Sequence, residues 1–598
     1  YNFTVAGGAK LAHYLCARYG AYPVIFFTSQ EVDATDDGNK LDDEWKPSFD
    51  AWNICDAYEH PATAHTHPST DENAAGDFAP QFTWADESGH DLFFHQWGHR
   101  GIPPTLELLE AYWRYAPAKP FLEVEANYEE LTVNAPHAAS VRQSAYKSIQ
   151  GGGAGFGYGA SGLWNFCTTH TQCACCHDVW GGAPWHEALH YPGGAQMAHL
   201  RRFYESLPWW RLEPRFSDAA WSSFSSPENA VLKTLGSDLY VLYAYGLYTP
   251  GTLRQLALGA RYRVMAFDPR HGWFYDLGTT TSNNGDYETP GRPSDDDWLF
   301  VLSREGTAPT FFSVDAAAET GGRIFPSGAL AVPGGGELTL HALPRTGFSL
   351  TAITLDGQAQ GAATSVILSN VTAAHGVRAT FSGQSPPHLI AEWKLEGAVY
   401  APALDHHGDH HGVPTPGVGF EDPGVRGKGR CAHLDGVGDS LDVPDAPSLK
   451  GMTGLTLSLW IRLDALPATG QSFAPLSKEN AYRLAISADG HAHVAIATSD
   501  DGWYTPDTTL DFGAALAPGT WHHLVATYDG LTLRTYLNGA LVKTGLPLSG
   551  PIASASTPLR FGASTSANIT ETAARIDEVR IYDAALSTAE VAQLNASY

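Results

Sequence analysis

Glu125 stands at the end of a short apolar run, within residues 119–129, where hydrophobic side chains give way to carboxylates. A buried strand that ends in a carboxylate presents an acidic group that can act on a sugar as acid, base or nucleophile. Other polar residues follow apolar runs in the same way: Gln30, Glu31, His65, Gln96, His99, Tyr158 and Trp164. We expect these strand ends to gather into one site.

A structural interpretation of the same residues is also open. Carboxylates at strand ends are often solvated loop residues, and Glu123, Glu129 and Glu130 surround Glu125. His65 and His99 fit structural histidines equally well, and Trp164 fits a core position. The pattern alone therefore leaves catalytic and structural roles side by side.

The elements that must position these residues alternate between strand and helix in residues 1–214. Strands are predicted at 22–27, 62–65, 91–96, 121–124 and 155–159, and helices at 10–19, 45–58, 105–115, 141–149 and 197–207. Such alternation predicts a parallel sheet with right-handed crossovers, and polar strand ends mark the active edge of a (β/α)8 barrel. Five strands are fewer than eight, so we expect a TIM-type barrel that lacks its first strands in this chain.

The rest of the chain is rich in strands and turns. We expect a β-sandwich accessory domain at residues 215–305, a small β domain at 309–382, a linker at 383–388 and a jelly roll at 389–598. A terminal helix should begin after Ser587, because Glu590 stands at the capping-box position.

Composition excludes several classes of partner. The formal net charge of −28 disfavours nucleic acid and anionic membranes. No apolar run approaches the roughly 20 residues of a membrane helix. The 17 tryptophans favour stacking surfaces for sugars. We expect a secreted or cell-surface protein that acts on or binds a glycan.

The seven cysteines are unevenly spaced. Cys16 and Cys55 lie on two predicted helices that flank one strand, and we expect a disulfide between them. Four more crowd one loop, where disulfides are favoured over zinc bound together with His177, and where the pairing is open: Cys167, Cys173, Cys175 and Cys176.

A series of motifs runs in order through residues 8–214: 16–25, Gln30 with Glu31, 60–61, 96–99, 119–120, Glu125, 155–159, Trp164, 187–193 and 207–210. This series resembles the apiosidase-like catalytic domain of glycoside hydrolases. The resemblance implies a retaining mechanism without a cofactor, with Glu31 as general acid/base after strand 4 and Glu125 as nucleophile after strand 7. It implies sugar contacts by Gln30, His65, Gln96, His99 and Tyr158, and stacking on Trp164.

The later domains resemble accessory modules. Residues 267–270 and 297–298 are similar to the collagen-binding-type β-sandwich that follows such catalytic domains. Residues 309–382 look like a bacterial surface B-repeat or Ig-like domain, and residues 389–598 like a laminin-G-like concanavalin-type jelly roll. Related jelly rolls often hold a structural Ca²⁺ where Asp435 and Asp577 stand here.

A second calcium hypothesis rests on spacing. Asp33, Asp37 and Glu44 fall at positions 1, 5 and 12 of a calcium loop, although an acidic solvated loop explains them as well. Residues 405–411 are rich in histidine and are interpreted as a turn rather than a metal site.

Three functions follow from these patterns. The first is an extracellular retaining glycoside hydrolase for complex polysaccharide with carbohydrate-binding domains. The second is a structural, adhesive or filament-forming surface protein on a degenerate barrel, with self-association. The third is a lectin-like glycan-binding protein.

Overall fold

The computed structural model describes residues 5–598 except 33–34, 37–38, 41, 67–83, 88, 99–100, 132–136, 170–171, 176–180, 362, 398–401, 416–417, 422, 501–508 and 567. The chain forms two compact units. Unit 1 comprises Tyr1–Ala316, Pro326–Thr339 and Ile367–Gly376, and unit 2 comprises Ala317–Phe325, Leu340–Val366 and Val377–Tyr598. The boundary therefore passes through the predicted small β domain.

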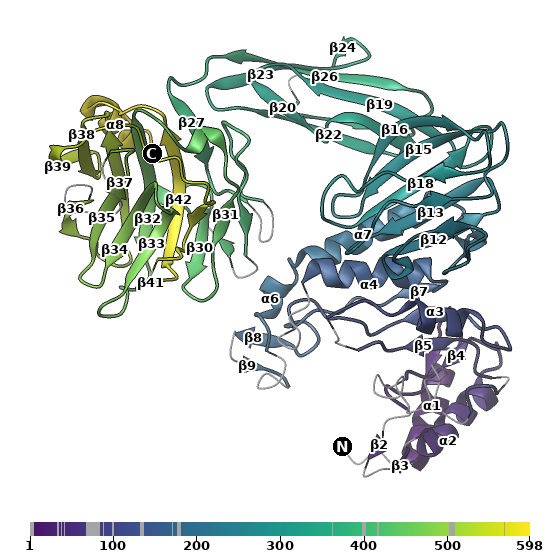
Figure 1. Ribbon diagram of the computed structural model, residues 1–598. Helices are drawn as coiled ribbons and strands as arrows, with labels where there is room; N and C mark the ends of the chain where they lie inside the picture. The colour runs from purple at the N-terminus through teal and green to yellow at the C-terminus, as the bar shows by residue number, and fades with distance from the viewer. Residues whose placement is uncertain are drawn as a thin grey trace. The chain divides into compact units, whose positions relative to one another are not determined.

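Unit 1 begins with parallel strands that alternate with helices (Figure 1). The strands are β1 Phe26–Phe27, β4 Ala62–Thr63, β5 Phe93–His95, β6 Phe121–Glu123 and β7 Gly155–Phe156. β1 pairs with β4, β5 with β6 and β6 with β7, all parallel, and a parallel bridge from His65 to Phe94 links β4 to β5. The five predicted parallel strands are present, each shorter than its apolar run.

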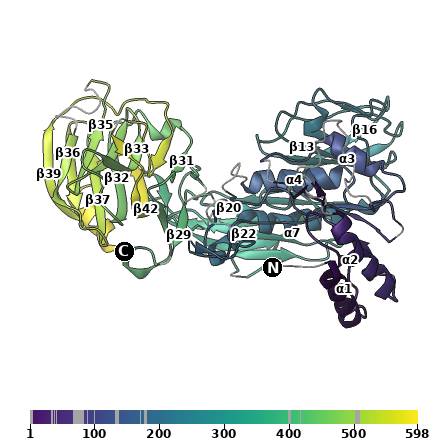
Figure 2. The ribbon, with the colours of Figure 1, turned by 90° about the horizontal axis from the view of Figure 1, so that it is seen from below.

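Helices pack against these strands, and their bounds are α1 Val5–Tyr19, α2 Asp42–Cys55, α3 Leu106–Trp113 and α4 Ala138–Gln150. α1 and α2 lie side by side (Figures 1 and 2). α3 begins after Thr105, whose side chain accepts the N–H of Leu108 at 3.3 Å. Phe49 of α2 and Phe93 of β5 are fully buried in the shared core, and burial of each contributes about 1.5–3 kcal/mol.

Short elements follow β7 in unit 1: β8 Cys167–Thr169, β9 Gln172–Cys173, α6 Trp185–Ala188, α7 Pro192–Glu205 and the 3-10 helix η2 Trp209–Arg211. A two-residue hairpin, β2 Thr35–Asp36 with β3 Asn39–Lys40, lies between β1 and α2. α7 packs against α4.

Antiparallel strands form the rest of unit 1. One sheet has the order β10-β12-β13-β18-β15-β16-β21-β19, and a small sheet has the order β11-β14-β17. Their bounds are β10 Glu213–Pro214, β11 Ser222–Ser223, β12 Ala230–Leu235, β13 Leu239–Ala244, β14 Thr252–Leu253, β15 Arg261–Asp268, β16 Trp273–Thr281, β17 Tyr287–Glu288, β18 Trp298–Arg304, β19 Phe311–Ala318 and β21 Gly328–Pro333, with η3 at Pro227–Asn229. The central strands β13 and β18 are buried on both faces, because α4 and α7 cover one of them.

Unit 2 begins with two small groups of strands, β20-β22-β25 and β26-β23-β24. Their bounds are β20 Gly322–Phe325, β22 Leu338–Pro344, β23 Phe348–Leu355, β24 Gln358–Ala359, β25 Ser365–Leu368 and β26 His375–Gly383. β23 and β26 run antiparallel with a register shift between Leu350 and Ala352.

A two-sheet jelly roll forms the remainder of unit 2 (Figures 1 and 2). One sheet has the order β29-β30-β42-β32-β37-β38-β39, with β27 paired to β42. Its bounds are β27 Leu389–Trp393, β29 Gly419–Glu421, β30 Cys431–Asp435, β32 Leu455–Leu463, β37 Trp521–Tyr528, β38 Thr532–Leu537, β39 Ala540–Pro547 and β42 Ala573–Tyr582.

The second sheet of the jelly roll has the order β28-β31-β40-β33-β34-β35-β36, with β41 paired to β33. Its bounds are β28 Val413–Pro414, β31 Leu441–Val443, β33 Ser472–Lys478, β34 Tyr482–Ser487, β35 His491–Ile496, β36 Thr509–Ala515, β40 Leu559–Phe561 and β41 Ile569–Thr570, with η4 Val425–Gly427 and η5 Pro447–Leu449 between strands. One continuous hydrophobic core fills the space between the two sheets.

The terminal helix α8, Thr588–Ala596, follows its sequence signal closely. Ser587 and Glu590 form the predicted capping box, with both reciprocal hydrogen bonds present. Among the described residues, no helix has the length and apolar character required to cross a bilayer.

Candidate functional site

The carboxyl ends of the parallel strands bring the predicted site residues to one edge. Each strand is followed within a few residues by one of the predicted polar groups: Gln30 and Glu31 after β1, His65 after β4, Gln96 after β5, Glu125 after β6 and Tyr158 after β7. Because these strands are parallel and adjacent, their ends lie at the same side of the sheet. His99 lies outside the described residues.

Glu125 is the centre of this arrangement. The residue is 8% exposed, and the Gln30 amide donates to its Oε2 at 2.7 Å. His65 Nε2 lies 3.9 Å from the same Oε2. A hydrogen bond from a neutral amide favours the ionised carboxylate, which is the form that a nucleophile requires. The two strand ends that carry the predicted carboxylates are thus in direct contact.

Glu31 lies next to Gln30 in a conformation that is uncommon for a side-chain-bearing residue. Its φ is 54°, in the left-handed region, and it is half-buried. The next residue, Val32, is fully buried and donates its N–H to the carbonyl of His65 at 3.0 Å. A carboxylate held in this region costs about 1–3 kcal/mol, and such strain collects at functional sites.

Tyr128 is a site residue that the sequence did not single out. Burial, the charge and hydrogen bond of Glu125, and the charge of Glu31 together raise the pKa of Tyr128. Its hydroxyl therefore stays protonated and lies within electrostatic reach of both carboxylates.

The glycine-rich run that begins in β7, residues 155–159, explains how Tyr128 is accommodated. A Cβ on Gly159 would stand 2.1 Å from Cδ1 of Tyr128, so only glycine leaves room for the ring. A Cβ on Gly157 would stand 2.4 Å from the carbonyl oxygen of Val124, where β6 and β7 approach closely. Trp164 lies beyond Tyr128, with ring centroids 6.0 Å apart, and is 39% exposed.

Gln96 faces the same edge from β5. It is 3% exposed, and its Oε1 is buried without a hydrogen-bond partner among the described residues. A buried carbonyl oxygen without a partner costs about 1–3 kcal/mol and suits a ligand hydroxyl that donates to it. The sugar contact of Gln96 stays a prediction.

A second carboxylate, Glu123, lies beneath the site. It is fully buried, accepts the N–H of Trp97 at 3.1 Å, and lies 3.6 Å from Nε2 of His95. His95 in turn contacts the Tyr112 hydroxyl at 3.1 Å. Glu123 therefore belongs to the internal support of the strands rather than to the accessible edge.

Tyr158 points to a different carboxylate from the one expected for a sugar contact. Its hydroxyl donates to Oε2 of Glu129 at 2.7 Å. Glu129 is fully buried and accepts the N–H of Gly193 in the first turn of α7 at 3.0 Å. Burial, against these two hydrogen bonds, raises the pKa of Glu129 to about 7. Glu129 is thus a buried carboxyl group with a pKa near neutral pH, only four residues beyond Glu125.

The disulfide predicted between Cys16 on α1 and Cys55 on α2 is absent. Cys16 and Cys55 are free thiols, so the predicted disulfide between them is not formed. They are close neighbours, however: burial, followed by a hydrogen bond and charge interaction with Cys16, raises the pKa of Cys55 to about 12. The Cys55 Sγ instead lies 3.7 Å from the carbonyl oxygen of Trp52 on its own helix.

In the crowded loop, Cys167 and Cys173 form a disulfide across β8 and β9. Two sulfurs in a disulfide are not available as zinc thiolates, which weakens the zinc alternative. Cys175 is exposed, and Cys176 and His177 lie outside the described residues.

The predicted calcium residues do not converge. Asp435 on β30 lies opposite Ala573 on β42. Ala573 is four residues before Asp577 on the same strand, so Asp435 and Asp577 are about 13 Å apart along the strand direction. The two carboxylates therefore cannot ligate one ion. Among the described residues, no group of three or more His, Cys, Asp or Glu side chains is arranged to hold a metal.

Each of the two jelly-roll carboxylates has its own partners. Asp577 accepts the N–H groups of Val425 and Glu578, and burial together with the charge of Glu578 raises its pKa to about 8. Asp435 accepts the N–H of Val437 at 2.7 Å. For the loop after β1, Asp33 and Asp37 lie outside the described residues, and Glu44 is exposed at the start of α2.

The histidine-rich turn is built by one carboxylate, as interpreted from the sequence. Asp405 is fully buried and accepts the N–H groups of Glu392, His407 and Gly408 at 2.9 Å each. His410 approaches the other carboxylate oxygen at 2.8 Å. Burial would raise the pKa of Asp405, but these hydrogen bonds outweigh it and lower the pKa.

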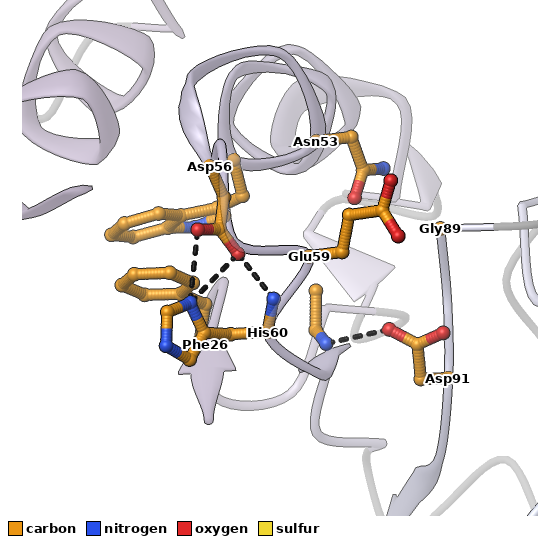
Figure 3. Close-up of a pocket in the computed structure, with 9 residues that line it drawn as sticks. Phe26, Asn53, Asp56, Glu59, His60, Gly89 and Asp91 are labelled. Atoms are coloured by element: carbon orange, nitrogen blue, oxygen red, sulfur yellow. Dashed lines mark hydrogen bonds and ion pairs between the residues drawn. The ribbon is translucent and has the colours of Figure 1, made fainter. Parts of the chain in front are cut away.

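A pocket of about 360 Å³ lies at the opposite ends of the strands (Figure 3). Phe26 and Ala62, which line it, are the first residues of β1 and β4, whereas Glu31 and Glu125 follow the last ones. Asp56 accepts the backbone N–H and the ring of His60, and Asp91 accepts the N–H of Ala62. The pocket is therefore separate from the carboxylate edge.

Comparison with known proteins now bears on this arrangement. Residues 2–211 match the family model of the apiosidase-like catalytic domain. Residues 435–592 match the model of the concanavalin A-like lectin/glucanases superfamily. No curated protein matches the chain.

Several solved structures are similar to parts of the chain. A glycoside hydrolase family 5 protein from Bacteroides vulgatus ATCC 8482 is 18% identical, covering 51% of this chain and 67% of that chain, with a TM-score of 0.42. Another structure, described as a glycoside hydrolase, is 20% identical over 51% of this chain and 70% of that chain, with a TM-score of 0.40. Domain 4 of a GH43 extracellular arabinanase from Geobacillus stearothermophilus, in complex with arabinotriose, is 21% identical over 35% of this chain and 100% of that chain, with a TM-score of 0.27.

The chain therefore combines a glycoside hydrolase-like N-terminal domain, similar to apiosidase-like catalytic domains, with sheet-rich domains and a concanavalin-like jelly roll.

Proposed function

We propose that the chain is an extracellular retaining glycoside hydrolase, with Glu125 as nucleophile and Glu31 as general acid/base. The observation that carries this proposal is the 2.7 Å hydrogen bond from Gln30 to Glu125, which joins the two carboxylate-bearing strand ends. The left-handed backbone at Glu31 and the interaction of the Tyr128 hydroxyl with Glu125 and with the charge of Glu31 support it. The domain similarity over residues 2–211 supplies the reaction class.

The proposed reaction has two steps. An oxygen of Glu125 attacks the anomeric carbon while Glu31 gives its proton to the departing glycosidic oxygen, which leaves a glycosyl ester on Glu125. Glu31 then takes a proton from water, and the water oxygen displaces the carboxylate with net retention of configuration. Gln30 orients Glu125 by its hydrogen bond before the attack, and Gln96 offers a buried carbonyl oxygen to a sugar hydroxyl.

The proposed substrate is a plant or algal polysaccharide, and the jelly roll is proposed to bind the same glycan. Release of reducing sugar from a panel of plant and algal polysaccharides measures the activity. We expect Glu125→Gln to abolish release while the circular dichroism spectrum and thermal unfolding stay those of the wild type. Glu205→Gln, an exposed carboxylate on α7, should keep full activity.

Hydrolysis that continues unchanged in Glu125→Gln would overturn the assignment of the nucleophile. Structural Ca²⁺ bound in the jelly roll at Asp435 or at Asp577, but not by both together, and self-association are further proposals. Metal analysis of the purified chain and light scattering in solution test them respectively.

A further inference from the structure

Two aromatic side chains in the segment that follows β7 are exposed to solvent as a parallel pair. Phe166 is 53% exposed and Trp185 is 39% exposed. Their ring centroids lie 6.2 Å apart and their planes differ by only 6°. Flat, parallel, exposed aromatic faces are the geometry on which the C–H face of a sugar ring stacks.

The backbone beneath the pair is fixed by buried neighbours. Asn165 and Cys167, on either side of Phe166, are 1% and 0% exposed. Asn165 accepts the N–H of Gly162 at 2.9 Å and donates to the carbonyl of Gly181 at 2.7 Å, which ties this turn to the segment that leads into α6. The Cys167–Cys173 disulfide adds a covalent anchor. β8 and α6, which carry the two segments, lie together in Figure 1.

Phe166 is held outward at a conformational cost. Its φ is 46°, a left-handed conformation that a bulky residue rarely adopts. An exposed phenylalanine gains little from burial there, so packing does not repay this cost. A surface position that keeps a strained, exposed aromatic ring suits contact with a ligand.

Two further aromatic residues, Tyr128 and Trp164, belong to the same part of unit 1 and begin beside Glu125. Tyr128 is hydrogen-bonded to Glu125, and the ring of Trp164 lies 6.0 Å from that of Tyr128. Trp164 is itself 39% exposed and stands two residues before Phe166. Trp164 therefore connects Tyr128, beside the proposed nucleophile, to the Phe166–Trp185 pair along the chain.

We propose that Phe166 and Trp185 form a distal subsite that stacks a sugar residue of an oligosaccharide whose reacting end lies at Glu125. This inference rests on the proposed function, because it assigns the second sugar-binding position of the same site. It predicts that affinity depends on chain length: only a ligand long enough to reach from Glu125 past Trp164 gains the contact.

The test uses the full chain carrying Glu125→Gln, so that ligands bind without being cleaved. Isothermal titration with arabinohexaose, xylohexaose and cellohexaose, and with the corresponding disaccharides, gives the dissociation constants. We expect Phe166→Ala or Trp185→Ala to weaken the best hexasaccharide about tenfold and to leave the disaccharide unchanged. Trp185→Phe should restore most of the affinity, because it keeps an aromatic face.

Controls separate stacking from other effects. Trp210→Ala removes a tryptophan that is 70% exposed on η2 and should leave all affinities unchanged. Phe166→Leu keeps an apolar side chain of similar volume without the ring and should behave as Phe166→Ala. Binding by the jelly roll is common to every variant and cancels in the comparison.

The subsite proposal is wrong if the double variant Phe166→Ala/Trp185→Ala binds the hexasaccharide as tightly as its parent. It is also wrong if the chain binds none of these sugars. The proposed function fails separately, if the wild-type chain cleaves no polysaccharide while hexasaccharide binding still depends on Phe166 and Trp185. Loss of disaccharide binding in the same double variant would also contradict a distal position.

Discussion

Glu129→Gln tests whether Glu129, the buried carboxyl group of unit 1 with a raised pKa, has a structural role. Glu129 is fully buried between the Tyr158 hydroxyl and the N–H of Gly193, and burial raises its pKa to about 7 from an ordinary value of 4.5. A glutamine has the same shape without the charge. Its carbonyl oxygen can still accept from Gly193 while its amide donates to the oxygen of Tyr158.

The magnitude follows from linkage between proton binding and folding. Between pH 4.5 and 7 the folded state keeps the Glu129 proton while the unfolded chain has lost it. The contribution of Glu129 to the free energy of unfolding is therefore fully present below pH 4.5 and is lost as the pH rises to 7. A shift of this size corresponds to about 3 kcal/mol. Glu129→Gln should remove this loss and stabilise unit 1 at pH 8 by about the same amount.

Scanning calorimetry of both proteins from pH 4 to 8 measures the effect on the transition of unit 1. The difference between variant and wild type should grow with pH up to 7 and then level off. Glu205→Gln, with its carboxylate 54% exposed on α7, the helix that carries Gly193, controls for charge removal. A difference that does not vary with pH would refute the reasoning. Loss of hydrolysis in a folded Glu129→Gln would show that Glu129, and not only Glu125, takes part in the chemistry.

Two further substitutions test the support around the site. The Asp297 carboxylate accepts hydrogen bonds from Arg142 Nε at 2.9 Å and from the Tyr243 hydroxyl at 2.9 Å. Asp297→Asn leaves the buried Arg142 guanidinium without its counter-charge. We expect it to lower the free energy of unfolding, measured in urea, by about 4 kcal/mol. Gly159→Ala places a Cβ 2.1 Å from Tyr128 Cδ1, and displacement of that ring by about 1 Å should lower kcat about a hundredfold with the fold retained.

Each of these substitutions has a matched control. Asp238 forms an exposed ion pair with Arg304 at 3.1 Å, and Asp238→Asn should cost under about 1 kcal/mol. A Cβ on Gly194 meets no atom closer than 3.6 Å, so Gly194→Ala should leave kcat unchanged. Equal costs for the two aspartates, or full activity in Gly159→Ala, would contradict the roles given to Asp297 and Tyr128.

Local signals in the sequence predicted local structure well. The capping box at Ser587 and Glu590 fixed the start of α8, because both hydrogen bonds form within one turn. The alternation of apolar runs predicted the five parallel strands and the edge at which Gln30 and Glu125 meet. These features depend on neighbours in sequence or on the handedness of crossovers, which hold across folds.

The remaining site residues depended on contacts between distant segments. Tyr158 follows β7 as the pattern requires, yet its hydroxyl reaches Glu129 because α7 brings Gly193 to that side. Tyr128 lies beside Glu125 instead, and its ring fits there because Gly159 has no Cβ. Spacing alone does not determine which of two nearby carboxylates a side chain meets.

The same limit applies to the cysteines. Cys16 and Cys55 lie on packed helices, as predicted, but remain thiols, whereas Cys167 and Cys173 pair within one short loop. A pairing between helices requires the two side chains to point at each other, which periodicity does not specify.

The identity of the nucleophile can be measured directly. Incubation of the chain with activated 2-deoxy-2-fluoro glycosides slows the second step and leaves the sugar attached to the nucleophile, which peptide mass spectrometry locates. The account predicts one adduct on the peptide that contains Glu125, absent in Glu125→Gln. An adduct on another carboxylate would contradict the central claim, and so would continued turnover of these glycosides in Glu125→Gln.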